Sequence, residues 1–247
     1  MRTTGIFLLV VLSLTLSFSG CNIADESGMK VMVVTGGHAY DTVEFEEMIG
    51  SFVGFDMEIV MQPSANQIIG SGAADKFEVI VFYDMWSEID SVGKAGYNRL
   101  LDRGIGMVFL HHALVSYQQW DEFKDIIGGR YYTEESGVDT SMYSTFHHDI
   151  ELNVEVSRND HPVTRGVTDY TIQDEGYKNI GIRDGIMVVL TTEHDDCDPY
   201  VGWVNTYKNS KIVYLMGGHD KQAYANENFR KLLGNSIKFV YRQGQSR

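Results

Sequence analysis

Short apolar segments alternate with amphipathic segments along the first half of the chain. The apolar segments are 30–34, 57–61, 77–83 and 104–110. Each ends at glycine or polar residues, as buried parallel strands do. The amphipathic segments begin near Asp41 or Thr42, at Asp90 and at Ser116, and each places apolar residues on one helical face. The alternation predicts βαβ units, and therefore an α/β fold with a doubly wound, mostly parallel sheet.

The second half of the chain has a different pattern. Residues 130–184 lack a helical period, and a closing helix follows the capping residue Asn226. The strand-like segments in this half are 150–156, 185–192, 200–207 and 211–216. No linker and no change in composition divides the chain, so we expect one folded domain over residues 29–242.

The beginning of the chain has the pattern of an export signal. An apolar stretch over residues 6–18 precedes Ser19-Gly20-Cys21, which resembles the lipobox of bacterial lipoproteins. The resemblance implies a signal peptide over 1–20, a diacylated Cys21 and a polar tether over 21–28. The alternative is an ordinary signal peptide cut near Gly20. We expect a lipid-anchored protein of the bacterial cell envelope, held at the membrane only through that anchor.

Composition and charge limit the kinds of molecule that we expect this protein to bind. The formal net charge of −14 argues against nucleic acid and anionic lipid surfaces, and suits a neutral carbohydrate or a cation. Neither a P-loop nor a GxGxxG sequence is present, so no nucleotide cofactor is expected. Cys197 is the only other cysteine, so an acylated Cys21 leaves no intramolecular disulfide.

Several polar residues follow predicted strands directly. The set is His38, Asp84, His111, His112 and His219. Since carboxyl ends of parallel strands share one edge of a sheet, we expect these side chains to converge there. The segment 130–184 adds two further sets of candidate residues, 147–149 and 173–175. Strand alternation favours His111 over His112 as the ring that points into the pocket.

Three interpretations of this set stay open. One is a divalent metal site for zinc, iron or manganese, held by His38, His111 and His219. Another is metal-free acid–base chemistry. The third is that individual histidines only bond the backbone, which we favour for His161 in its His-Pro loop. Aromatic residues that suit sugar stacking, or equally a core, are Tyr131, Tyr132, Tyr177, Trp203 and Tyr207.

A series of short motifs resembles the ThuA-like (trehalose utilisation) family in the family's order. The motifs are Val-Val-Thr-Gly-Gly-His38, Val-Phe-Leu-His-His112, Ile-Gly-Gly-Arg-Tyr131, His161-Pro-Val-Thr-Arg-Gly166, Asp174-Glu-Gly-Tyr177, Val-Gly-Trp203 and Gly-Gly-His-Asp220. The resemblance implies a ThuA-like domain over 29–242 with a class I glutamine amidotransferase-like, flavodoxin-like three-layer fold. In that fold a cysteine nucleophile occupies the strand-to-helix elbow, where this chain has His111-His112. Lys221 stands where the amidotransferase acid is usual, so we do not expect a glutaminase.

The resemblance also implies a function in carbohydrate metabolism. The family is associated with disaccharide catabolism alongside sugar oxidoreductases, so we expect an enzyme acting on a disaccharide or 3-keto-glycoside by acid–base or metal-assisted chemistry. The candidate catalytic residues are His111, His112, Glu175 and His219. The candidate substrate-binding residues are Gly37, His38, Asp84, Tyr177, Trp203 and Asp220. The alternative is a non-catalytic carbohydrate-binding lipoprotein.

Overall fold

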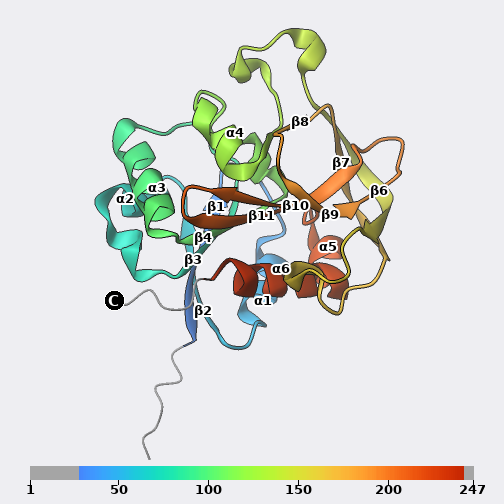
Figure 1. The fold of residues 1–247 in the computed structure, drawn as a ribbon, viewed down its shortest axis with the longest axis horizontal. Coiled ribbons are helices and arrows are strands. Elements are labelled where there is room, and N and C mark those ends of the chain that lie inside the picture. The colour runs from blue at the N-terminus through green and yellow to red at the C-terminus, as the bar shows by residue number, and fades with distance from the viewer. Residues whose placement is uncertain (1–27, 242–247) are drawn as a thin grey trace, which may run out of the picture.

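A nine-stranded sheet runs through residues 28–241, which are the part of the chain that the computed structural model describes (Figure 1). The predicted signal peptide over 1–20, the predicted lipidation site Cys21 and nearly all of the predicted tether lie outside the described residues. Within the described residues, no helix has the length and apolar character needed to cross a membrane.

The sheet has a parallel half and an antiparallel half. Its strand order is β2-β1-β3-β4-β11-β10-β9-β6-β7. Neighbours from β2 to β11 are parallel, and neighbours from β11 to β7 are antiparallel. The strands are β1 (Met29–Gly36), β2 (Phe55–Met61), β3 (Val79–Asp84), β4 (Gly106–Leu110), β6 (Thr145–Val156), β7 (Tyr170–Lys178), β9 (Met187–Thr191), β10 (Tyr200–Tyr207) and β11 (Ser210–Leu215), with β5 (Gly129–Arg130) and β8 (Gly181–Ile182) in a separate pair.

Helices cover both faces of the sheet. Figure 1 shows α1, α5 and α6 on one side and α2, α3 and α4 on the other. They are α1 (Thr42–Gly50), α2 (Ser64–Ser71), α3 (Ser91–Arg103), α4 (Asp121–Ile127), α5 (Lys221–Ala225) and α6 (Glu227–Val240), with short 3₁₀ turns at Ala73–Lys76, His111–Val115, Glu134–Ser136, Thr140–Met142 and Pro162–Thr164. This arrangement confirms the predicted three-layer α/β fold.

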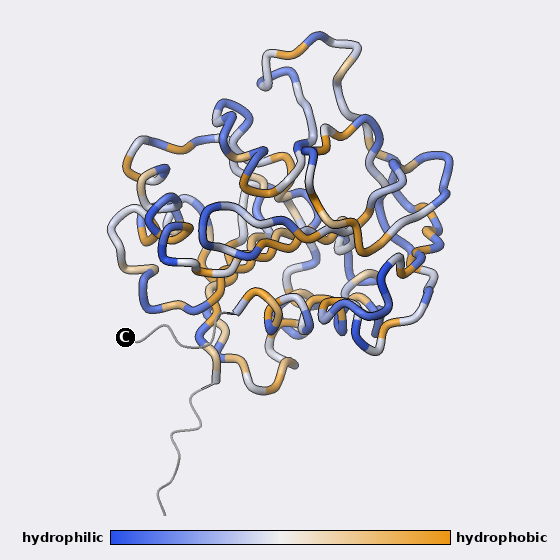
Figure 2. The backbone as a smooth tube through the Cα atoms, viewed as in Figure 1, coloured by the Kyte–Doolittle hydropathy of each residue, from blue (hydrophilic) through white to orange (hydrophobic). Residues whose placement is uncertain are grey.

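The core follows the apolar strands. Every residue of β3 and of β4 is buried, because helices cover both faces of these central strands. Figure 2 shows the same strands as a hydrophobic band through the middle of the molecule. Asp90 and Asn226 accept backbone N–H groups and so begin α3 and α6 as predicted.

The structure departs from the predicted elements in several places. The helix expected from Ser116 begins at Asp121 instead, because Tyr117 has a φ of 51° and Ser116 Oγ bonds the loop after β3. The pattern also did not predict α2 or β7. In β7, Asp174 and Glu175 are buried, so the strand lacks the polar-out alternation that marks a half-exposed strand.

The antiparallel half curls back toward the centre of the sheet. β7 is five strands away from β4 in the sheet order, which corresponds to about 24 Å in a flat sheet at about 4.8 Å per strand. A side chain of β7 nevertheless lies 3.0 Å from the residue that follows β4. The long strand β6 makes the corner, because its first ten residues face β7 and its last two pair with β9.

Candidate functional site

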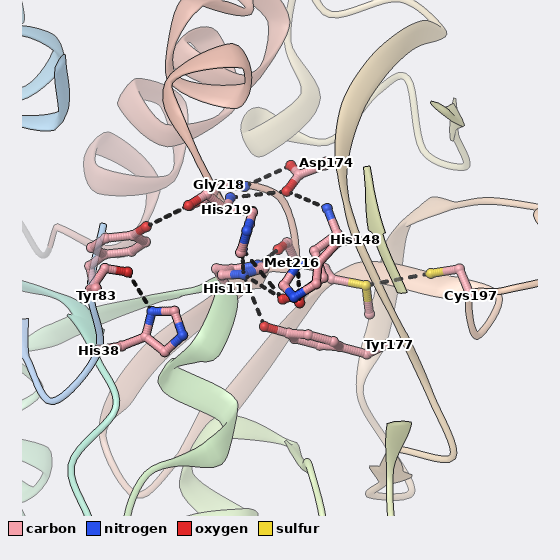
Figure 3. Close-up of polar contacts among 12 residues, drawn as sticks. His38, Tyr83, His111, His148, Asp174, Tyr177, Cys197, Met216, Gly218 and His219 are labelled. Carbon is pink, nitrogen blue, oxygen red and sulfur yellow. Dashed lines mark hydrogen bonds and ion pairs between the residues drawn. The ribbon is translucent and has the colours of Figure 1, made fainter. Parts of the chain in front are cut away.

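Three polar atoms from distant segments meet at the carboxyl end of the parallel half. His111 Nε2 lies 3.0 Å from Glu175 Oε2 and 3.2 Å from His219 Nδ1. Glu175 Oε2 lies 3.5 Å from His219 Nδ1. These side chains, the His–Glu–His group, are 1%, 7% and 21% exposed in chain order. Figure 3 shows His111 and His219 pointing toward one another.

Backbone geometry fixes His111 within this group. The residue follows β4 directly and has a φ of 47°, which turns the chain sharply out of the strand. Its Nδ1 lies 2.8 Å from the carbonyl oxygen of Met216. Since a carbonyl only accepts, Nδ1 carries the hydrogen. In the neutral ring Nε2 therefore presents its lone pair to the centre of the group, and only the protonated ring donates from Nε2 to Glu175.

Asp174 holds the segment that carries His219. Its carboxylate accepts the backbone N–H groups of Gly218 at 2.8 Å and of His219 at 2.9 Å (Figure 3). It also accepts the N–H of Glu175, the next residue of β7, at 2.9 Å. Burial raises the pKa of Asp174, although His111 and these backbone hydrogen bonds act in the opposite direction. One side chain thus links two members of the group to each other.

The electrostatics of the group favour an ionised carboxylate. Burial acts to raise the pKa of Glu175, but hydrogen bonds and charge interactions with His111 and His219 outweigh it and lower the pKa. The hydrogen bond to Glu175 raises the pKa of His219. Burial and the neighbouring Glu175 raise the pKa of Tyr177 well above its ordinary value. Its hydroxyl, 3.0 Å from His111 Nε2, therefore stays protonated and is a donor.

The geometry of the group fits a divalent cation. Metal–ligand bonds of about 2.1 Å place neighbouring ligand atoms about 3.0 Å apart at 90° and about 3.4 Å apart at the tetrahedral angle. The three separations here are 3.0, 3.2 and 3.5 Å. The hydrogen bond from His111 to a backbone carbonyl is the usual support of a metal-bound imidazole. Within residues 28–241, these three side chains could hold a metal ion.

Two of the predicted residues, His38 and His112, lie beside the group. His112 is buried and its ring nitrogens have no hydrogen-bond partner among the described residues. Burial, followed by repulsion from His111 and His38, lowers its pKa. The exposed ring of His38 stacks on His112 at 4.9 Å and bonds the carbonyl of Ala39 through Nδ1 (Figure 3). The structure thus brings Glu175, and not His38, together with His111 and His219.

The other predicted residues have mainly structural positions. Trp203 is fully buried, packs against the ring of Tyr214 and donates its indole N–H to the carbonyl of Ile127, so the structure places it in the core and not at the site. Asp220 caps α5 through its side chain. At Gly37, with a φ of 85°, an added Cβ would lie 1.8 Å from the Met85 carbonyl oxygen, so only glycine fits there.

Asp84 and His161 also bond within the protein. Asp84 is buried and accepts a hydrogen bond of 2.8 Å from Gln62 Nε2. Burial raises its pKa to about 7. His161 Nδ1 accepts the backbone N–H of Val163 and caps a 3₁₀ turn, in agreement with the structural role favoured for it.

Sequence reasoning missed several supports of the site. The sequence gives no signal for the Met216 carbonyl, which accepts from His111 Nδ1, or for the Tyr214 hydroxyl, which donates to the carbonyl of His111. In each contact one of the two atoms belongs to the backbone, so residue identity does not reveal the pair. For Asp174 and His148, the sequence gives only the candidate segments 173–175 and 147–149 that contain them. The side chain of His148 contacts Glu175 Oε1 at 2.9 Å, and nothing in the spacing of the two segments indicates this pairing.

Comparisons with known proteins agree with the fold. A ThuA-like protein from Parabacteroides merdae is similar at 17% identity with a TM-score of 0.73, over 87% of this chain and 90% of that one. One from Bacteroides uniformis is similar at 18% identity with a TM-score of 0.67, over 92% and 96% of the two chains. PurLQS from Thermotoga maritima is similar at 15% identity with a TM-score of 0.50, over 86% and 99%.

The family comparison covers nearly all described residues. Among curated proteins, none matches this chain. A family model described as ThuA, trehalose utilisation, matches residues 27–240. That span contains the whole His–Glu–His group and the residues that support it. This chain therefore belongs to the ThuA family.

Proposed function

We propose that this protein is a metal-dependent carbohydrate enzyme that acts on a disaccharide carrying a ketone, such as a 3-keto-glycoside. The observation that carries the proposal is the triangle formed by His111 Nε2, Glu175 Oε2 and His219 Nδ1. Its sides have the lengths expected between ligands of one cation. The family description, trehalose utilisation, supports the carbohydrate class.

Two imidazoles and one carboxylate suit zinc, manganese or ferrous iron, and they leave coordination positions free for substrate. A bound cation would supply Lewis-acid chemistry, polarising the ketone and lowering the cost of removing a proton from the neighbouring carbon. The remaining steps fall to the side chains around the group. Elimination or isomerisation of a keto-sugar needs a base for that proton and a donor for a substrate oxygen.

His38 and Tyr177 are our candidates for these two roles. The Nδ1 of His38 bonds a carbonyl oxygen, so its Nε2 is the free acceptor in the neutral ring. The ring is exposed and can therefore take a proton from a bound sugar. Tyr177 keeps its hydrogen and lies beside His111 Nε2, where it can donate to a substrate oxygen. Because the ring nitrogens of His112 are buried, we assign it a packing role.

The setting of the reaction is also part of the proposal. A ketone on the sugar ring requires a prior oxidation of a secondary alcohol, so a sugar oxidoreductase must act before this enzyme. The lipobox-like Ser19-Gly20-Cys21 supports a lipid-anchored location in the cell envelope. The acidic chain suits a neutral sugar.

Incubation of the purified protein with 3-keto-trehalose and other 3-keto disaccharides tests the proposal. We expect product with Zn²⁺, Mn²⁺ or Fe²⁺, none after chelation, and recovery on adding metal back. His38→Gln should lose turnover and keep metal binding, whereas His147→Gln should match the wild type. Sugar binding without turnover under every metal condition would favour the non-catalytic carbohydrate-binding alternative.

A further inference from the structure

The strand β6 contains a bulge directly opposite Glu175. Register along the β6–β7 pair shifts between His147, which faces Gly176, and Ile150, which faces Asp174. The two residues between them, His148 and Asp149, therefore face Glu175 alone. Asp149 has a φ of 55°, a left-handed conformation that aspartate adopts more readily than most residues. Bulges redirect side chains, and this one brings His148 toward the carboxylate.

His148 contacts the side of Glu175 that faces away from His111. Its Nδ1 lies 2.9 Å from Oε1 of Glu175, while Oε2 faces His111 and His219. The ring of His148 also packs against the ring of His219, with centroids 4.9 Å apart, and against Phe146 at 4.8 Å. Figure 3 shows His148 on the side of the site opposite His38.

This contact determines which carboxylate oxygen of Glu175 faces the centre of the His–Glu–His group. The terminal torsion of a glutamate is soft, so an unrestrained carboxylate rotates or offers both oxygens to a cation. With His148 Nδ1 held 2.9 Å from Oε1, only Oε2 is turned to the centre of the group. A carboxylate that binds through one oxygen keeps an adjacent coordination position free for substrate.

We propose that His148 is a positioning residue, which holds Oε1 of Glu175 so that Oε2 alone faces the bound cation. The inference rests on the proposed function, because it concerns the metal site. It adds a residue outside the His–Glu–His group. It also assigns a role to the bulge in β6, which directs His148 toward Glu175. Partners of this kind, which hold a metal ligand without touching the metal, commonly change affinity by about 10- to 100-fold.

His147 provides a matched control for this residue. It is the same residue type one position earlier, and its side chain is 48% exposed against 50% for His148. Its ring lies 3.9 Å from Asp196 and not at Glu175. A change at His147 thus alters the charge and composition of the same strand without touching the carboxylate.

Calorimetric titration of the chelator-treated protein with Zn²⁺ and with Mn²⁺ tests the inference. We expect His148→Ala to weaken binding about 10- to 100-fold, as loss of such a partner does. His148→Phe, which keeps a ring against His219 but has no donor, should weaken it similarly. His148→Asn, which returns a donor near the position of Nδ1, should restore most of the affinity, and His147→Ala should match the wild type. Thermal melts in chelator check that each variant folds.

The outcomes separate the two proposals. Wild-type protein that binds neither ion contradicts the metal site, and the role of His148 is overturned with it. Wild-type binding that is unchanged in His148→Ala and His148→Phe overturns the role of His148 alone. Equal weakening in His148→Ala and His147→Ala also overturns it, because a loss of charge in β6 would then explain the effect.

Discussion

At the scale of single residues, the site depends on which side-chain atom is not already hydrogen-bonded to the backbone. His111 and His38 both bond a backbone carbonyl through Nδ1, yet only the Nε2 of His111 meets a carboxylate and a second imidazole. The sequence predicted both histidines at strand ends and as metal ligands, but only His111 as a catalytic residue. The difference arises from the backbone turn at each residue, which residue identity does not specify.

Asp84 allows a prediction about pH. Its pKa in the folded protein is about 7 against an ordinary value of 3.8. Between these values the folded state binds more protons than the unfolded state, so Asp84 lowers stability as the pH rises from about 4 to about 7. Asp84→Asn should be more stable than the wild type at pH 8, by up to a few kcal/mol, and by a smaller margin, less than half of that, at pH 5.

Urea unfolding at the two pH values measures this difference. The exposed Asp56→Asn provides the control, for which the difference from the wild type should not depend on pH. An Asp84→Asn variant that differs from the wild type by the same free energy at both pH values would contradict the buried, protonated acid.

At the scale of elements, the sequence predicted the parallel half better than the antiparallel half. Buried strands such as β4 are uninterrupted apolar segments between polar ends, and they are recognisable without a partner. β7 is recognisable only once its neighbours are known, because its buried positions include Asp174 and Glu175. Their burial depends on contacts with residues 111, 218 and 219. The candidate residues were therefore predictable, and their pairing was not.

The bulge in β6 provides a prediction at this scale. Asp149 adopts a left-handed backbone conformation, which glycine tolerates freely and β-branched residues resist. Asp149→Val should be less stable than Asp149→Gly by about 1–2 kcal/mol. It should also weaken metal binding, because a rearranged bulge no longer directs His148 at Glu175. Urea unfolding and metal titration of both variants measure these effects, and equal behaviour would show that the bulge is not constrained there.

At the scale of the whole molecule, the site joins the two halves of the sheet. His111 and His219 follow β4 and β11 of the parallel half, whereas Glu175 comes from the far edge of the antiparallel half. The corner in β6 brings that edge back to the centre. The fold class was predictable from the alternation of strands and helices, but this return was not, because strand order is a long-range property.

We propose that one divalent cation binds at His111, Glu175 and His219. Elemental analysis after the purified protein is loaded with Zn²⁺ or Mn²⁺ and freed of excess ion measures it most directly. We expect one ion per chain for the wild type and for His147→Ala, and a large loss for Glu175→Gln and His111→Ala. A wild type that retains no ion, or a Glu175→Gln variant that retains as much as the wild type, would contradict the account.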